Sequence, residues 1–256
     1  MSKLKLFVQS YYDVQRARIA FDQRYAAASP KDPEQKVRMV IDAETLTFIE
    51  GRQASLQEDL DATLKEIKNE LKKYPVWLEW LKDVKGVGEL MGAVLISSLD
   101  IEKPNVSKWW QYCGLNPGEI FGWVSDGKDE EGNPKWKISD KKIRGDKKTP
   151  GFRCPYNAWL KTKLMGVLTT SFIKSQSSYA LRFYYSLHMG KEKQKQGLTG
   201  RLDNEEGWKK ESDKHRHFAA MRYMLKMFLL EFFIKWREIE GLPVPPPYQE
   251  AYLNHR

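Results

Sequence analysis

The stretch from residue 34 to residue 74 contains no proline and a single glycine, Gly51. It favours one long helix, and about 40 residues of helix span on the order of 60 Å. Its apolar residues recur at close to heptad spacing with charged residues between them: Ile49, Leu56, Leu60, Leu64, Ile67 and Leu71. A helix of this length with one narrow apolar seam cannot bury that seam against a small core, so it needs a partner helix.

Two partners fit the seam: an earlier helix of the same chain, or the same helix in a second copy. We predict a homodimer through this arm, with the intramolecular hairpin as the alternative. The earlier helix is indicated by apolar residues three and four apart from Leu4 to Tyr25, and it ends at AAASPKDP. Asp32 is the predicted N-cap of the long helix, with Pro33 at its first position. Residues 1–75 are therefore predicted as a helical hairpin or coiled-coil arm.

Helical patterns dominate the rest of the chain, at residues 77–84, 89–99, 106–115, 156–191 and 214–241. Between them, residues 121–155 are rich in Gly, Asp, Asn and Lys. A short β-hairpin fits there, with residues 123–124 and 136–138 on either side of a Gly-Asn turn. The predicted fold is mainly α: the arm, a helical core at 76–241 with a small β-hairpin or loop insertion, and a proline-rich tail at 242–256. Predicted core residues of the last helix are Met221, Met224, Leu225, Phe228, Leu229 and Phe232.

The composition excludes several classes of protein. Hydrophobic residues make up 41% and aromatic residues 12% of the 256 residues, which is too rich for a disordered chain. Cys113 and Cys154 are far apart and lack any zinc-ligand spacing, which argues against a zinc site and against a disulfide framework. We therefore expect no metal, no cofactor and a reducing cytoplasm. No apolar run matches a signal peptide or a membrane span.

The positive charge is concentrated in one segment. Residues 132–174 carry 11 Lys/Arg against two Asp/Glu, a surplus equal to the net charge of +9 of the whole chain. This predicts a face that binds a polyanion, with lysine and arginine on phosphates and aromatic side chains on unpaired bases. The alternative is a solvated lysine loop whose aromatic residues point into the core, as we expect for Trp159. The predicted nucleic-acid-binding residues here are Lys135, Lys137, Lys141, Lys142, Arg144, Lys147, Lys148, Arg153, Tyr156, Lys161 and Lys163.

A second candidate interface is the sequence LKDVKGVGELMGAVLISSL at residues 81–99, which has the form of a helix-hairpin-helix. Gly86 suits a positive φ, Gly88 lets a phosphate approach the N–H groups that open the following helix, and Lys85 adds a charge. The same glycines also fit an ordinary turn in which Val87 fills the core, and Glu89 has the wrong charge for a phosphate site. Both interpretations remain open from the sequence.

The last helix opens with a basic cluster that includes His215 and Arg216, and continues with Arg222 and Lys226. His215 and His217 are two residues apart and lie on different helix faces, which makes a poor metal pair. We predict that His215, Arg216 and Arg222 lie on a polar face that meets RNA or a neighbouring subunit.

No pattern in the sequence predicts catalysis. A two-metal nuclease needs several carboxylates that converge from separate elements, whereas the acidic run at residues 129–131 lies beside a glycine turn, where we expect it to be solvated. HExxH, GxSxG, P-loop and HxE/PCxxC patterns are all absent from the sequence. We therefore expect a binding protein without an enzymatic site.

Residues 76–117 resemble the start of the C-terminal domain of the bridge-RNA-guided insertion-sequence transposases. The shared order is a helix, the GxG turn, an alanine-containing apolar helix, an acidic connector, a helix and the Gly-Leu-x-Pro at residues 114–117. Residues 157–191 and 214–236 resemble that family's tyrosine-containing element and final helix, and residues 49–74 its coiled-coil arm. Two parts of the family pattern are missing here: a RuvC-like domain before the arm, and a serine shortly after Gly-Leu-x-Pro, where this chain has Ile120-Phe121-Gly122.

The arm with a helical core is also similar to the Nop domain of box C/D ribonucleoproteins. Proteins associated with tandem interspaced guide RNAs (Tas proteins) have such a core, some without a nuclease domain. This resemblance implies a Nop-like, homodimeric protein that holds a guide RNA, which finds target DNA by base pairing. Two alternatives remain: a degenerate or compact transposase that acts on DNA, and a helix-hairpin-helix protein that binds duplex DNA.

Overall fold

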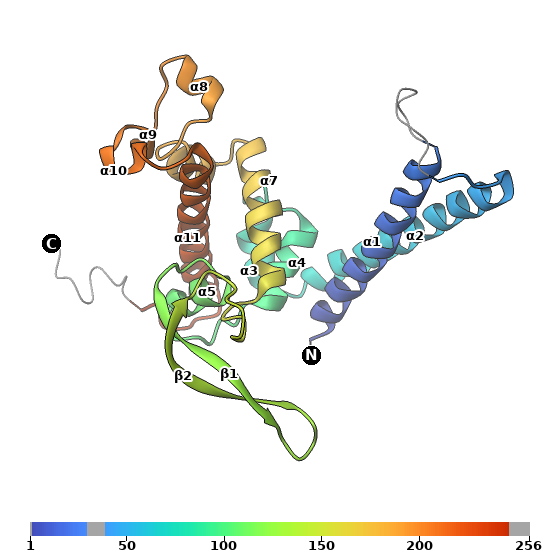
Figure 1. Cartoon of the computed structure of the whole chain (residues 1–256), viewed down its shortest axis with the longest axis horizontal. Coiled ribbons are helices and arrows are strands. Elements are labelled where there is room, and N and C mark those ends of the chain that lie inside the picture. Colours follow the sequence, from blue (N-terminus) through green and yellow to red (C-terminus); the bar gives the residue numbers. More distant parts are fainter. Residues whose placement is uncertain (1, 30–38, 246–256) are drawn as a thin grey trace. The chain divides into compact units, whose positions relative to one another are not determined.

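The computed structural model describes residues 2–29 and 39–245 (Figure 1). The protein is mainly helical, with 61% helix, 9% strand and one small two-stranded antiparallel sheet, so the predicted fold class is confirmed. The chain divides into two compact units. Unit 1 comprises residues 1–78 and 88–98, and unit 2 comprises residues 79–87 and 99–256. None of the helices in the described part combines the length and apolarity needed to cross a membrane.

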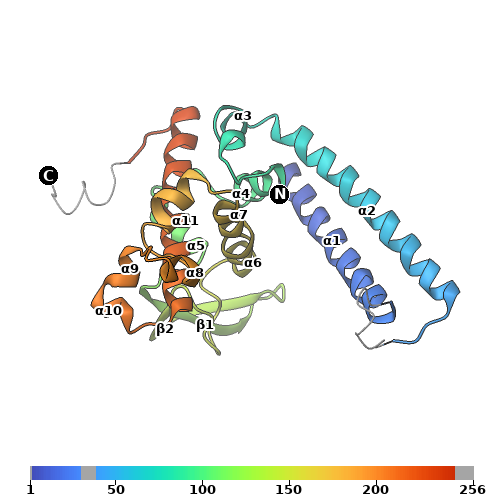
Figure 2. The same cartoon turned by 90° about the horizontal axis from the view of Figure 1, so that it is seen from above.

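Unit 1 is built on a helical hairpin of α1 (Lys3–Ala28) and α2 (Ala43–Leu71), which lie side by side (Figure 2). The apolar seam of α2 is largely covered within the chain: all of its residues are buried except Leu64, which is half-buried, and Leu4, Val8 and Tyr12 of α1 are buried as well. Gln53 of α2 donates a hydrogen bond to Asp22 of α1 at 2.8 Å. The intramolecular hairpin is therefore present, and the homodimer stays a prediction.

The start of α2 differs from the prediction. The helix begins at Ala43 and not at Pro33, and residues 39–42 are not helical. Asp42 is the N-cap: its extended backbone precedes the first turn, and its carboxylate accepts from the Thr45 N–H at 2.7 Å. Glu44 adds negative charge at the positive end of the helix dipole. The predicted cap at Asp32-Pro33 lies outside the described residues.

Helix α4 (Glu89–Ser98) completes unit 1 and packs against both α1 and α2. Its residues 91–96 are all buried, as expected for a helix that is apolar on every side. Gly92 allows a close approach, because a Cβ at this position would overlap the Trp77 ring. The preceding helix α3 (Pro75–Glu79) is short, and a 3-10 turn, η1 (Leu81–Asp83), follows it. The helix predicted for 77–84 is thus broken at Trp80.

Unit 2 is organised around α11 (Asp213–Ile239), against which several shorter elements pack. They include α5 (Val106–Tyr112), the π-helical turns η2 (Lys163–Leu168) and η3 (Ala180–Tyr184), and α7 (Thr169–Lys174). All six residues of α11 that we predicted as core are buried. Their aromatic members pack with other rings: Phe232 lies 5.5 Å from Trp109 and 5.9 Å from Trp80, between ring centroids.

The helix predicted for 156–191 is interrupted. It consists of α6 (Ala158–Thr162), η2, α7 and η3, with a break at Gln176, whose φ is +50°. The expectation that Trp159 is a core residue is wrong, because its side chain is 36% exposed and the neighbouring Leu160 is buried. Three short helices were not predicted: α8 (Lys191–Lys195), α9 (Arg201–Asn204) and α10 (Glu206–Lys209).

The predicted β-hairpin is present and longer than expected. Strands β1 (Glu119–Lys128) and β2 (Pro134–Arg144) pair antiparallel, with Trp123 opposite Ile138 and Ser125 opposite Trp136. Asp129 fixes the turn, because its carboxylate accepts from the N–H groups of Glu131 and Asn133. The distal half of the hairpin extends beyond the helices of unit 2 (Figure 1).

Candidate nucleic-acid interface

Eight of the predicted binding residues form one continuous segment of unit 2, which we call the basic strand and loop. Strand β2 carries five of them and the loop at residues 145–157 carries three. All eight side chains are exposed: Lys135, Lys137, Lys141, Lys142, Arg144, Lys147, Lys148 and Arg153. The structure thus places most of the positive surplus of the chain on a hairpin edge and the loop that follows it.

In the distal part of the hairpin, at residues 135–138, the strand register separates aromatic from basic side chains. Because side chains alternate along a strand, Trp136 and Ile138 of β2 share a face with Trp123 of β1, and Lys135 and Lys137 lie on the other face. Trp123 is 41% exposed and Ile138 is 61% exposed. Nearer the base of the hairpin, Lys142 lies opposite Phe121 and its ammonium is 5.8 Å from the centroid of that ring. The hairpin therefore offers exposed apolar side chains with positive charge beside them, a combination that single-stranded nucleic acids bind.

Most of the exposed lysines have no partner of opposite charge. Lys137 pairs with Asp126 at 2.8 Å, and Arg144 pairs with Asp146. Within residues 2–29 and 39–245, no ion pair forms at Lys135, Lys141, Lys142, Lys147 or Lys148. Unpaired positive charges at one surface raise the local potential and attract a polyanion.

Arg144 and Lys161 both form hydrogen bonds that hold the loop at Asp146. Asp146 is buried, and Arg144 binds its carboxylate with two hydrogen bonds of 3.0 and 3.1 Å. Lys161 of α6 donates to the Asp146 carbonyl. Burial lowers the pKa of Lys161, with Arg222 acting in the same direction and Asp146 opposing it. Two predicted residues, Arg144 and Lys161, thus bind Asp146, and the charge of a third, Arg222, acts on Lys161.

Tyr156 packs against the backbone at the end of α5. Gly114 has a φ of +65°, and a Cβ there would come within 2.8 Å of the Tyr156 ring. The Lys161 ammonium lies 4.5 Å from the centroid of that ring. Burial raises the pKa of Tyr156. Lys163, the remaining basic residue of this segment, lies over the Trp159 ring at 5.8 Å.

The first glycine of the Gly-x-Gly turn packs within unit 2. Gly86 has a φ of +100°, as predicted, and a Cβ there would approach the Phe172 ring to 2.7 Å. Ser171 Oγ donates to the Gly86 carbonyl at 2.8 Å, and Val87 is 6% exposed. These interactions belong to a turn packed on α7, the structural alternative that the sequence left open. Lys85 is exposed.

The second glycine precedes a helix start that already holds a carboxylate. Gly88 is exposed and a Cβ there would meet open space. The pKa of Glu89 is lowered, first by a hydrogen bond from its own backbone N–H and further by Lys68, whose ammonium lies 3.2 Å away. A phosphate at the start of α4 would therefore be repelled by this carboxylate unless it displaced it.

The basic residues at the start of α11 have different environments. His215 lies 2.8 Å from Glu211 and both side chains are about half exposed. The Arg216 side chain is only 13% exposed and pairs with the buried Asp203 carboxylate at 3.3 Å, so it serves the fold rather than the exposed basic surface. Arg222 is half-buried, and burial together with Arg222 lowers the pKa of its helical neighbour Lys226.

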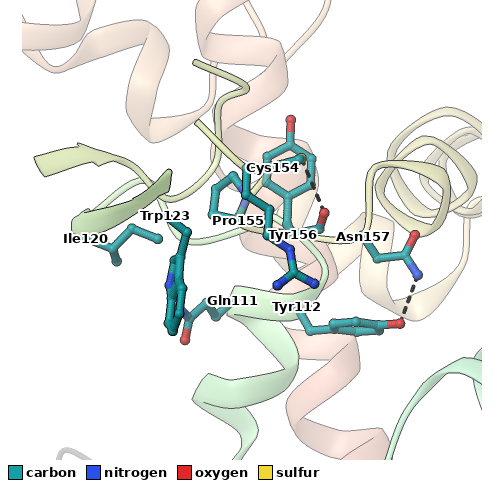
Figure 3. A pocket seen from close by; sticks show the side chains of 9 residues that line it. Gln111, Tyr112, Ile120, Trp123, Cys154, Pro155, Tyr156 and Asn157 are labelled. Atoms are coloured by element: carbon teal, nitrogen blue, oxygen red, sulfur yellow. Dashed lines mark hydrogen bonds between the residues drawn. The ribbon is translucent and has the colours of Figure 1, made fainter. Parts of the chain in front are cut away.

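A pocket next to the hairpin was missed by sequence reasoning. It has a volume of about 380 Å³ and lies between β1, the end of α5 and the loop before α6 (Figure 3). Its lining residues are Gln111, Tyr112, Ile120, Trp123, Arg153, Cys154, Pro155, Tyr156 and Asn157. Of these, Arg153 and Tyr156 were predicted to bind nucleic acid. The strand register could have indicated Trp123, but nothing in the sequence brings α5 beside β1.

Among the described residues, no group of three or more His, Cys, Asp and Glu is placed to hold a metal ion. Cys113 is buried, Cys154 is half-buried, and neither forms a disulfide. Burial raises the pKa of the Cys113 thiol. Comparisons with protein-family models, with curated proteins and with solved structures give no match for this chain.

Proposed function

We propose that the protein binds RNA through the basic strand and loop and serves as the protein part of a guide ribonucleoprotein. In this role the protein holds the RNA backbone, and base pairing by the RNA reads the sequence of a DNA target. In this proposal the protein binds the RNA and has no nuclease activity of its own.

The observation that carries the proposal is the group of five exposed lysines without an ion pair in the described chain, next to an aromatic hairpin face. Lysines neutralise phosphates and release counterions whatever the sequence, whereas exposed rings stack on bases that are not paired. Trp123 and Ile138 are too exposed to serve only the core. Single-stranded or looped RNA fits this combination better than a regular duplex, whose bases are stacked inside.

The guide role rests on the resemblance to Nop-domain proteins and to the bridge-RNA-guided transposases, given above. It is supported by the order of elements: a helical arm, the glycine turn, Gly-Leu-x-Pro, and a long final helix. A homodimer through the arm is part of the same proposal, since the second copy would complete a two-sided holder for the RNA.

Binding of duplex DNA by the helix-hairpin-helix segment has less support. Gly86 and Val87 pack inside unit 2, and the carboxylate of Glu89 occupies the start of α4. A transposase activity has the resemblance of residues 76–117 in its favour, but no group of three or more His, Cys, Asp and Glu in the described part of the chain is placed to hold a catalytic metal ion.

The test is to purify the full chain at physiological salt from the cells that encode it and to sequence the nucleic acid that accompanies it. The proposal expects a discrete small RNA, present in stoichiometric amount and removed by ribonuclease treatment. Recovery of protein free of nucleic acid, or with only random fragments, would contradict the guide role. Size determination of the complex then shows whether two protein copies hold one RNA.

A further inference from the structure

Two of the aromatic side chains that line the 380 Å³ pocket beside the hairpin are exposed to solvent. Tyr112 at the end of α5 is 42% exposed and Trp123 on β1 is 41% exposed. Buried aromatic residues elsewhere in unit 2 form the core, whereas these two rings reach solvent at one cavity. The volume lies in the range of roughly 300–1,000 Å³ that is typical of sites for small organic groups.

The walls are held in place before any ligand arrives. Asn157 donates from its side chain to the Tyr112 hydroxyl at 2.9 Å, and from its backbone N–H to the Tyr112 carbonyl at 2.9 Å. The Arg153 N–H donates to the Trp123 carbonyl at 2.8 Å. Figure 3 shows Trp123 and Asn157 on opposite sides of the pocket, from different elements. A site held by such bonds loses little conformational entropy on binding.

One polar group of the pocket remains available. The side-chain oxygen Oδ1 of Asn157 accepts from the Leu160 N–H at 3.0 Å, so that side-chain amide is committed to the start of α6. In the described part of the chain, the half-buried Gln111 has no side-chain hydrogen bond. Its amide offers one acceptor and two donors, the complement of the edge of a nucleobase.

Positive charge lies at the same pocket. Arg153 lines it, and its guanidinium is 5.5 Å from the centroid of the Trp136 ring, on the aromatic face of the hairpin. Tyr156, another lining residue, belongs to the loop that carries Lys147 and Lys148, and the Lys161 ammonium is 4.5 Å from the centroid of its ring. A flat aromatic ligand that enters this pocket would carry its phosphates toward cationic side chains.

We infer that the pocket receives one unpaired nucleobase of the bound RNA, stacked against Trp123 or Tyr112 and contacted at its edge by Gln111. This inference rests on the proposed function, since it names where the RNA is held. It adds an interaction that depends on the base to the interactions of the lysines, which depend only on the backbone. An RNA with a base turned out of its helix is therefore the preferred ligand.

The first test locates the base. Single-stranded 12-nucleotide RNAs with a central 4-thiouridine or 6-thioguanosine are bound to the full chain and irradiated, and crosslinked peptides are identified by mass spectrometry. The inference expects crosslinks to peptides that contain Trp123 or Tyr112 with at least one of the two probes. Crosslinks confined to peptides outside the pocket, with RNA bound, would overturn it.

The second test measures affinity for 12-nucleotide homopolymers of each base. Trp123→Ala should weaken binding of the preferred homopolymer by about 5- to 150-fold, the range found for removal of one stacking ring. Trp123→Phe keeps a ring and should restore most of this affinity. The control is Leu198→Ala, in unit 2, 50% exposed and outside both the hairpin and the pocket lining, which should leave affinity close to that of the wild type.

A double-mutant cycle combines Trp123→Ala with an RNA that has an abasic central nucleotide. If the two changes remove the same interaction, Trp123→Ala should not weaken the affinity for the abasic RNA any further. Wild-type RNA binding with no decrease for Trp123→Ala overturns the inference and leaves the proposed function standing. Failure of the wild-type chain to bind any of these RNAs overturns both. Should Trp123→Ala fail to fold, Gln111→Ala and Trp123→Phe decide, with weaker binding expected for the former and retained binding for the latter.

Discussion

The Gly-x-Gly turn and the basic strand and loop both combine glycine or turn residues with lysine, yet their side chains are used in different ways. In the turn, Gly86 and Val87 are packed within unit 2 and Ser171 binds the Gly86 carbonyl. In the basic strand and loop, lysines such as Lys141 and Lys142 are exposed and form no ion pair in the described part of the chain.

The difference shows which residue types can be free for a ligand. A glycine at positive φ is needed by the fold itself, so its presence carries no information about a phosphate. An exposed lysine contributes little to stability, and a surplus of them at one surface has its main effect on association. We therefore expect changes in the turn to act on stability and changes in the basic strand and loop to act on RNA binding.

The largest expected effect on stability is that of Gly86→Ala. A φ of +100° and a Cβ 2.7 Å from the Phe172 ring together should lower the free energy of unfolding by about 2–5 kcal/mol. The measurement is urea denaturation followed by circular dichroism. RNA affinity of the folded fraction should stay unchanged.

Gly88→Ala is the matched control in the same turn. It meets open space and its φ is not in the left-handed region, so the expected cost is about 1 kcal/mol or less, that of a weaker residue before a helix start. A decrease of RNA affinity in Gly88→Ala with stability intact would show that the turn binds RNA, and the contrast between the two regions would then be incorrect.

A smaller effect is expected for Arg144→Ala. The change leaves the buried Asp146 carboxylate without its two hydrogen bonds, but the Arg144 side chain is 55% exposed, so solvent weakens the pair. We expect destabilisation by about 1–2 kcal/mol in thermal or urea unfolding. Lys141→Ala, on the same strand and without an ion pair in the described chain, should change stability by less than about 0.5 kcal/mol. Equal destabilisation of the two variants would refute the distinct roles assigned to them.

The smallest effect is on the pH dependence of stability. Burial lowers the pKa of His217, with His188 adding to this and Asp213 opposing it. The unfolded chain therefore binds this proton more readily than the folded one. The contribution of His217 to the free energy of unfolding is fully present above about pH 6.5 and decreases as the pH falls below that value. The Tyr184 hydroxyl, whose pKa burial raises to about 12, lies 2.7 Å from His217 Nδ1.

His217→Gln should flatten the pH dependence of the unfolding temperature between about pH 5 and 7. The basic strand and loop contains no histidine, so RNA affinity at fixed salt should stay nearly constant over the same range. A marked pH dependence of RNA affinity in a chain that remains folded would place a titrating group at the interface.

Much of the fold could be predicted because its signals are local. The heptad spacing indicated α2, the three- and four-residue intervals indicated α1 and α11, and the Gly-Asn turn indicated the hairpin. The predicted start of α2 was wrong because Asp42 is as good an N-cap residue as Asp32. The spacing of apolar residues alone cannot decide which of two such residues begins the helix. Trp159 was placed in the core because its helix was predicted as continuous, whereas α6 buries Leu160 instead.

The candidate site could be predicted only in part. Charge density located the lysines, since charged side chains lie at the surface unless they are paired. The sequence did not show that Arg216 pairs with Asp203, because 13 positions separate them and their pairing depends on how the segment before α11 folds. Tyr112 and Trp123 meet at one pocket only through the packing of the hairpin beside α5, which no local pattern encodes.

The salt dependence of RNA binding tests the central claim most directly. Two double variants are compared with the wild type on one single-stranded RNA: Lys141→Ala with Lys142→Ala, and Lys82→Ala with Lys85→Ala, two exposed lysines beside the glycine turn. In a plot of log affinity against log salt, the first should reduce the slope by about 1.4, at roughly 0.7 for each phosphate that the protein no longer neutralises. The second should leave the slope unchanged. The opposite result, a wild-type slope in the first variant and a reduced slope in the second, would contradict the account.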